Sequence, residues 1–285
     1  MDIQDLIKFC LQASVIINVY ALGMETTRQD VVYVLGRPAL LLRAVLAIFV
    51  IMPVLAIVLV KLFGMTHALQ VTLLCLAISP VPPLLPKRQD KGGGHSGFAL
   101  GLMVCMALLA LVLIPLWLGQ MGRIFGQSTR LDIGAIAWTV MKMIVLPLLV
   151  GMAVRAWLPV LAGRVTRPAI VLAGWLLPLA GLVVVYAMHQ ALWQLLVGGA
   201  WMALAIFTLL GLAAGHLLGG PDIDQRVVLG VSTASRHPGI AFALAAANAP
   251  QDHAVPALIG LYVLLSFILT LLYMKWQARR VARNV

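Results

Sequence analysis

The sequence SPVPPLLPKRQDKGGGH, residues 79–95, and the sequence VSTASRHPG, residues 231–239, interrupt two otherwise apolar stretches of the chain. Proline lacks the amide hydrogen that an α-helix needs, and its ring crowds the preceding turn, so neither stretch can continue as a regular helix. Similar text follows both interruptions, because GFAL begins at Gly97 and GIAFAL begins at Gly239. The sequence therefore contains two related breaks.

The composition around these breaks is typical of a membrane protein. Of the 285 residues, 62% are hydrophobic and 10% are charged, and the mean hydropathy is +1.04. A soluble domain carries about 25% charged residues, so this chain has too little polar surface to fold in water. The apolar stretches are expected to face lipid or one another, which makes the lipid bilayer the first expected partner.

Segments long enough to cross a bilayer recur along the whole chain. A crossing helix needs about 20 mostly apolar residues. Hydropathy and charge predict about nine such spans, at residues 5–24, 39–61, 66–86, 96–119, 133–157, 167–188, 190–219, 223–249 and 254–277. We therefore predict an all-α membrane protein with one break in the third span and one in the eighth.

The basic residues predict the orientation of these spans. With the C-terminus in the cytoplasm, most of the 20 Lys and Arg residues fall in cytoplasmic segments. The exceptions are Lys8, Lys61, Arg123 and Arg130 in outer segments, and Lys142 and Arg236 within spans. Basic residues gather on the cytoplasmic side of membrane proteins, so we expect a multi-pass protein of the cell membrane with its N-terminus outside. The net charge of +11 forms no single patch, and a nucleic-acid partner is not expected.

The spacing of the two breaks indicates an inverted-topology repeat. The breaks lie five spans apart, and because five is odd, the two copies run in opposite directions across the membrane. Paired interrupted segments at matching positions indicate the binding site of a secondary transporter. Backbone that leaves the helix at membrane depth lines a cavity or is buried in protein. An enzyme is not expected, because no metal-protease, nucleophile-elbow or phosphate-loop motif is present.

Several short motifs, in this order and spacing, resemble the bile acid:sodium symporter family. They are Ala21–Met24, Arg37-Pro38, Ile51–Pro53, the run from Pro80 to Pro115, Lys142–Pro147 and His237–Ala241. The chain is similar to the nine-helix type of this family. The resemblance implies a panel domain of spans 5–24, 133–157 and 167–188, and a core domain of the other six spans. It also implies two broken helices that cross at the middle of the membrane, and organic anions as substrates driven by sodium.

The chain departs from the family at the positions that the resemblance assigns to sodium ligands. These positions are occupied by Leu85, Pro86, Ser232, Arg236 and Ile48. A sodium ion needs several oxygen ligands, usually with one carboxylate to offset its charge. Sodium coupling is therefore not expected unless backbone carbonyls alone suffice, and no metal site or other cofactor is assigned.

Positive charge stands where the family has a cation and its carboxylate. Arg236 lies inside a span, where an unpaired charge costs about 2.5 kcal/mol or more. A guanidinium suits a carboxylate or sulfonate, and it also has the charge to replace a bound sodium ion. The predicted substrate-binding residues are Arg236, His237, Ser232, Thr233, Lys87 and Arg88. A proton is the alternative coupling ion, with Asp90, His95 and His237 as candidate carriers.

Each candidate also has a structural interpretation. Arg236 can form an internal ion pair with Asp90, and Lys87 and Arg88 can be ordinary cytoplasmic loop charges. His237 can be a hydrogen-bonded interior residue and Ser232 a small packing residue. The sequence predicts a secondary active or facilitative transporter of a small organic anion, with altered or absent sodium coupling. The alternative is a non-transporting membrane sensor or partner subunit on the same scaffold, which the proline-rich first break favours.

Overall fold

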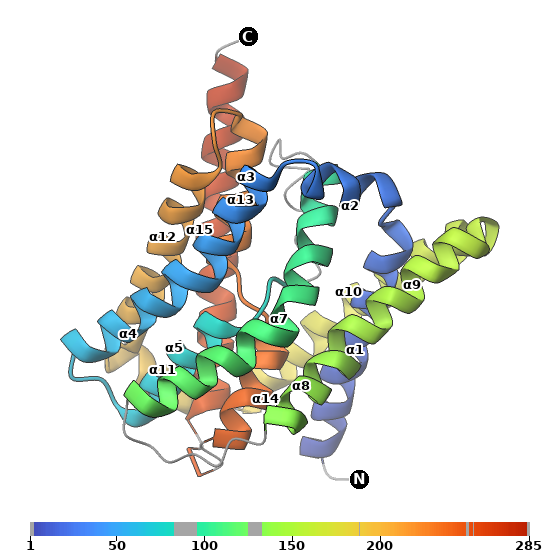
Figure 1. The fold of residues 1–285 in the computed structure, drawn as a ribbon. Helices are drawn as coiled ribbons and strands as arrows, with labels where there is room; N and C mark the ends of the chain where they lie inside the picture. Colours follow the sequence, from blue (N-terminus) through green and yellow to red (C-terminus); the bar gives the residue numbers. More distant parts are fainter. Residues whose placement is uncertain are drawn as a thin grey trace.

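The protein is an all-α membrane protein (Figure 1). The computed structural model describes residues 3–82, 96–124, 133–187, 189–248, 251–252 and 254–283, and no strand occurs within these ranges. Four helices of this described part are long and apolar enough to cross a membrane: Pro38–Leu62, Gly97–Ile124, Ala200–Leu218 and Val255–Arg280.

The first half of the chain forms a long helix, a short helix, a helix with a π-helical turn, the first broken segment and a second long helix. The elements are α1 (Ile3–Glu25), α2 (Arg28–Leu35), α3 (Pro38–Val45), η1 (Leu46–Ile51), α4 (Met52–Leu62), α5 (His67–Ile78) and α7 (Ser96–Ile124). The π-helical turn η1 joins α3 and α4 into one continuous rod. The helix α5 is only 12 residues long and ends one residue before Ser79.

The second half repeats this pattern of a rod with a π-helical turn followed later by a broken segment. Its elements are α8 (Ile133–Val140), η2 (Met141–Val145), α9 (Leu146–Trp157), α10 (Pro159–Ala187), α11 (His189–Val197), α12 (Ala200–Leu218), α13 (Ile223–Ala234), α14 (Pro238–Asn248) and α15 (Val255–Arg283). The break between α13 and α14 covers residues 235–237.

Three features differ from the predicted spans, and one is that α10 begins at Pro159 instead of residue 167. The short helix α2 was not predicted; it begins at a capping box in which the Thr27 hydroxyl and the Asp30 carboxylate each bond the other's backbone N–H. The predicted span 190–219 consists of two helices, α11 and α12. Gly199 separates them because its φ of 74° lies in the left-handed region, which glycine adopts without strain.

The helix α1 packs against α9 and α10, whereas α12 packs against α13 and α15. Glycines allow the α1–α9 contact to be very close, because a Cβ at Gly23 would collide with Leu148 O and one at Gly151 with Tyr20 O. These contacts do not test whether a panel and a core move as separate bodies, and that division stays a prediction.

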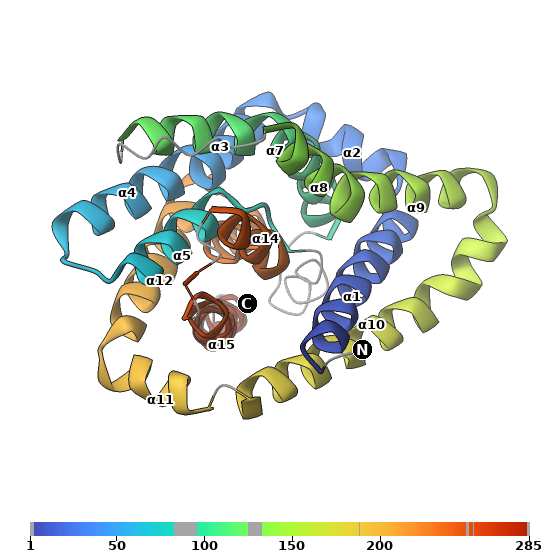
Figure 2. The same ribbon diagram turned by 90° about the horizontal axis from the view of Figure 1, so that it is seen from below.

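The two broken segments lie in the interior of the bundle. Seen from below, α5 and α14 lie side by side within the ring formed by the surrounding helices (Figure 2), and they pack against each other. The start of α1 and the end of α15 lie at opposite ends of the molecule (Figure 1). An odd number of crossings requires this arrangement, although the count of nine stays a prediction.

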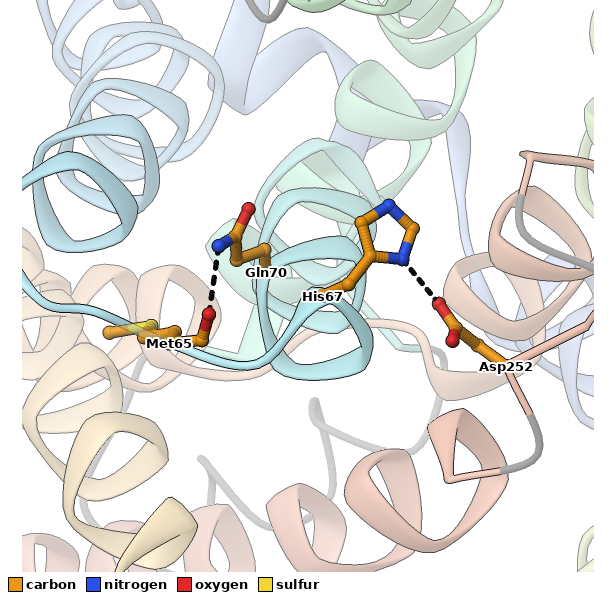
Figure 3. A network of polar contacts seen from close by, with 4 residues as sticks. All are labelled: Met65, His67, Gln70 and Asp252. Carbon is orange, nitrogen blue, oxygen red and sulfur yellow. Dashed lines mark hydrogen bonds and ion pairs between the residues drawn. The ribbon is translucent and has the colours of Figure 1, made fainter.

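A side-chain hydrogen bond joins the ends of the broken segments at the side of the molecule opposite the end of α15. His67 Nδ1, at the first residue of α5, lies 2.6 Å from Asp252 Oδ2, in the connection between α14 and α15 (Figure 3). Gln70 Nε2 donates to Met65 O at 2.9 Å and holds the turn before α5 (Figure 3). Side chains at this end therefore fix the start of the first broken segment relative to the end of the second.

Candidate functional site

The two breaks meet through a backbone hydrogen bond. The His237 N–H, in the break between α13 and α14, donates to Pro80 O at 2.9 Å, just beyond the end of α5. The side chain of Arg236 lies beside this contact and is only 1% exposed. Residues that are far apart in the sequence are therefore brought together where both helices are interrupted.

Prolines explain why unpaired carbonyl oxygens are present at this crossing. A proline at position i leaves the carbonyl of residue i−4 without its helical donor. Pro80 therefore has no N–H for Leu76 O, which accepts instead from the Ser79 N–H at 3.1 Å and from the Ser79 hydroxyl at 2.8 Å. Ser79 O in turn lies four residues before Pro83, so a continuing helix could not pair it either.

The guanidinium of Arg236 supplies donors to two such carbonyls. Its Nη1 donates to Ser79 O at 3.3 Å, and its Nη2 donates to Ile48 O at 3.1 Å. Its Nε has no hydrogen-bond partner among the described residues. The guanidinium thus joins the first broken segment, the second broken segment and the bent helix in the way that a cation with oxygen ligands would.

The π-helical turn η1 explains why Ile48 O is available. Pro53 lacks the N–H that would pair with a carbonyl one turn earlier, at Ile48 or Phe49. Both carbonyls accept hydrogen bonds from other segments: Arg236 in the second break donates to Ile48 O, and the Trp117 indole N–H on α7 donates to Phe49 O. The π-helical turn in this rod is therefore part of the site.

The second break is held in the same way from α15. Pro238 removes the helical donor to Ala234 O, and the Tyr262 hydroxyl donates to Ala234 O at 2.7 Å. Tyr262 is buried, and its ring lies 6.3 Å from the ring of Phe207 on α12, measured between centroids. This contact fixes the end of α13, and with it the position of Arg236.

The other predicted residues on α13 are also buried. Ser232 and Thr233 lie in the last turn before the break, and Thr233 Oγ1 has no hydrogen-bond partner within the part of the chain that the structure describes. The predicted residues Lys87, Arg88, Asp90 and His95, with Leu85 and Pro86, lie outside the described residues. The suggested ion pair of Arg236 with Asp90 is therefore not tested.

A small cavity lies next to the crossing. Its lining comes from α1, α7, the rod of η2 and α9, and the two breaks, and consists of Val19, Leu22, Val81, Met103, Ala107, Ile144, Leu148 and His237. It has room for about one water molecule. His237 has the polar side chain in this lining, and its Nε2 has no partner among the described residues.

Comparison with known protein families matches residues 13–195 to the sodium bile acid symporter family. This chain belongs to the sodium bile acid symporter family. The matched range includes the first break and ends before α12, so Arg236 and His237 lie beyond it. A comparison with curated proteins found no match. The family comprises transporters. At the level of the family, the chain is therefore a symporter-like transporter.

Two of the positions that the resemblance assigns to sodium ligands are in direct contact. Ile48 and Arg236 are joined by the hydrogen bond from Nη2 to Ile48 O. Ser232, a third such position, lies one turn of α13 before Arg236. The guanidinium is therefore bonded to the backbone at a position where the resemblance places a cation ligand.

Sequence reasoning missed the residues that position this site. It did not single out Trp117, Tyr262 or the carbonyl of Ile48, because their partners are backbone atoms on other helices. Pro53 was one available signal, since a proline in the middle of an apolar span always frees carbonyl groups for other donors.

Proposed function

We propose that this protein carries a small organic anion across the cell membrane without sodium, and that the guanidinium of Arg236 serves as its permanent internal cation. The observation that carries the proposal is the placement of Arg236, buried at the crossing and bonded to Ser79 O and Ile48 O. A charge that is part of the chain needs no ion to be bound before the crossing region is stable.

The charge of Arg236 also supports an anionic substrate. Arg236 forms no ion pair with any residue that the structure describes. Among the described residues, the guanidinium is bonded to carbonyl oxygens alone. A buried charge in such surroundings produces a strong positive potential in a low-dielectric region. An anion that binds at the crossing would offset this potential. Lys87 and Arg88 stay candidates for further contacts to the anion, and Ser232 and Thr233 for positions near it.

The second candidate function is a membrane sensor or partner subunit that does not transport. One observation favours it: prolines and leucines occupy the first break, at positions 81–86, where the resemblance places small polar residues. The buried guanidinium of Arg236, which has no ion-pair partner among the described residues, favours the carrier instead.

Uptake into proteoliposomes tests the proposal. The purified protein is reconstituted and offered a panel of labelled carboxylates and sulfonates that includes a bile acid. We expect uptake of at least one anion, and a loss of at least about tenfold in Arg236→Ala, because two carbonyls lose their donor and the anion loses its attractive charge. Guanidinium ion added to the buffer is expected to restore part of the Arg236→Ala uptake.

Arg279→Ala is the matched control, because Arg279 is an exposed arginine near the end of α15. Its uptake should equal that of the unchanged protein. Folded protein that takes up no anion in the panel would support the sensor or partner subunit. Uptake that persists at full rate in Arg236→Ala would contradict the role of the internal cation.

A further inference from the structure

Three rings gather between α12 and α15, near the C-terminal ends of both helices. The rings of His216 on α12 and of Tyr273 and Trp276 on α15 lie 5.8 to 6.1 Å apart, measured between centroids. His216 Nδ1 lies 2.8 Å from the Tyr273 hydroxyl, and Gln277 Nε2 lies within 3.3 Å of both atoms. These contacts hold the two helices together and give the cluster a defined shape.

Arginine side chains border this cluster on two sides. The guanidinium of Arg280 stacks on the Trp276 ring, with its central carbon 4.1 Å from the ring centre. On the other side, the Tyr273 hydroxyl donates to the backbone carbonyl of Arg226 at 3.2 Å. This hydrogen bond places the first turns of α13 beside the rings.

A third arginine reaches the same place from α3. Arg226 Nε donates to Gly220 O at 2.6 Å, in the turn between α12 and α13. A Cβ at Gly220 would lie only 3.3 Å from Nη1 of Arg43, in the last turn of α3. Figure 1 shows α3 and α13 together at the end of the molecule that carries the C-terminus. Two guanidinium groups therefore converge on one turn.

These three positive charges have no counter-ion within the part of the chain that the structure describes. The guanidinium groups of Arg43 and Arg280 donate no hydrogen bond there, and Arg226 donates through Nε alone. The acidic residues close by in the sequence, Asp222 and Asp224, stand at the N-terminus of α13, where the helix itself favours negative charge. Like charges that converge in this way attract an anion from outside the chain.

Exposed apolar side chains accompany the basic ones. Leu42, next to Arg43, is 68% exposed, and Leu217, next to His216, is 80% exposed. Trp276 is 43% exposed, and tryptophan is enriched where a membrane meets water. A partner that fits this surface therefore has an anionic group for the arginines and an apolar part for the leucines.

An anionic phospholipid has both parts. A phosphate accepts paired hydrogen bonds from a guanidinium group, and basic pockets between helices on the cytoplasmic side of a membrane bind anionic headgroups. The charge distribution predicts that this end of the molecule is cytoplasmic. A soluble anion would offset the charge of the arginines but would leave the leucines exposed.

We propose that Arg43, Arg226, Arg280 and Trp276 form a binding site for the phosphate of an anionic membrane lipid, whose acyl chains lie along Leu42 and Leu217. The bound phosphate joins α3, α13 and α15. The rod that begins with α3 carries Ile48 O, and α13 ends just before Arg236, so the lipid stabilises the two segments that the internal cation also joins. The inference goes beyond the proposed function, because it requires neither a substrate nor transport.

Thermal unfolding in lipid–detergent micelles tests this site. The purified full chain is freed of lipid in a nonionic detergent and receives phosphatidylglycerol or phosphatidylcholine at equal mole fractions. We expect a saturable rise in unfolding temperature with phosphatidylglycerol and a much smaller one with phosphatidylcholine, because a ligand of the folded state stabilises it. Glycerol 3-phosphate, a headgroup without acyl chains, should give no rise at the same concentration.

Two variants remove one charge each from the edges of the site. Arg43→Gln and Arg280→Gln change exposed side chains that donate no hydrogen bond within the described residues, so both variants should fold. We expect each to weaken phosphatidylglycerol binding at least about tenfold, measured as the lipid concentration at half of the maximal temperature rise. Native mass spectrometry should show fewer phosphatidylglycerol molecules retained by both variants.

Arg164→Gln is the matched control. Arg164 is an exposed arginine of α10, which begins at the opposite edge of the molecule from α12 (Figures 1 and 2). The charge distribution predicts that it lies on the same side of the membrane, and its substitution should leave lipid binding unchanged.

Three results would overturn the proposal. Equal stabilisation by both lipids would show that the arginines do not select negative charge. Equal stabilisation by glycerol 3-phosphate would show a site for soluble anions. An equal loss in Arg164→Gln and Arg43→Gln would show that the lipid responds to the overall charge of the surface. Since none of these measurements involves uptake, their failure would leave the proposed function untouched, and an absence of uptake would leave the lipid site untouched.

Discussion

Prolines at the crossing remove helical donors, and side chains of nearby residues or of other segments donate in their place. The carbonyl oxygens concerned and their donors are Leu76 with the Ser79 hydroxyl, Phe49 with Trp117, Ala234 with Tyr262, and Ile48 and Ser79 with Arg236. A buried carbonyl without a partner costs about 1–3 kcal/mol. Each replacement donor therefore stabilises a local break that the prolines impose.

Tyr262 tests this pairing of broken helices with distant donors. Tyr262→Phe keeps the ring against Phe207 and removes the O–H that pairs with Ala234 O. We expect a loss of about 1–3 kcal/mol of stability, seen as a lower unfolding temperature in detergent. Tyr20→Phe is the control and should change little, because Tyr20 lies on the face of α1 that packs against α9 and α10. An unchanged unfolding temperature in Tyr262→Phe would contradict the role of this hydrogen bond.

The sequence was sufficient to predict which residues interrupt the helices, and it was not sufficient to predict their partners. Pro80, Pro238 and Arg236 stand out because a proline or a charge inside an apolar span is unusual. The partners of Arg236 are the carbonyl oxygens of Ser79 and Ile48. Every residue has a carbonyl, so only the arrangement in space reveals which carbonyls face the guanidinium.

At the scale of helices, apolar length and charge predicted the long elements well. The rod of α3, η1 and α4 extends over Pro38–Leu62, close to the predicted span 39–61. The short helix α2 was missed because its composition is mixed, although Thr27 and Asp30 have the spacing of a capping box. The π-helical turns were missed because they depend on where neighbouring helices offer donors.

The contact between α1 and α9 depends on small residues. A Cβ at Gly151 would collide with the backbone of α1 at Tyr20 O, so Gly151→Val forces the two helices apart. We expect several kcal/mol of destabilisation, of the order that overpacking a close contact causes. The measurement is the fraction of protein that elutes as a single monodisperse species in size-exclusion chromatography.

Gly260→Ala is the control for this substitution. A Cβ at Gly260, in α15, meets no atom within 4 Å. Alanine favours a helix over glycine by about 1 kcal/mol, so this variant should be at least as stable as the unchanged protein. If both variants behave alike, the close contact of α1 with α9 is not what stabilises this part of the fold.

At the scale of the whole molecule, the charge distribution predicts the orientation in the membrane. The described end of α15 carries exposed basic residues at Lys275, Arg279 and Arg280, with the guanidinium of Arg280 4.1 Å from the centre of the Trp276 ring. Basic residues beside an interfacial tryptophan are typical of a cytoplasmic membrane boundary. A fluorescent protein that folds only in the cytoplasm, fused after Val285, is expected to fluoresce in bacterial cells. A dark fusion with an active periplasmic reporter at the same position would reverse the orientation.

The presence of an internal cation also predicts how sodium affects the stability of the purified protein. Sodium at a free concentration of 100 times its Kd would stabilise the folded state by about 2.7 kcal/mol, if the folded protein bound it. Because the guanidinium of Arg236 already occupies the crossing, sodium should find no comparable site there. The effect of sodium on stability can be measured without knowing the substrate.

Thermal unfolding of the purified protein in sodium chloride and in choline chloride at equal ionic strength is therefore the most direct test. We predict the same unfolding temperature in both salts at every concentration. A saturable rise in sodium alone would show that the chain binds the ion that Arg236 was inferred to replace, and would contradict the account.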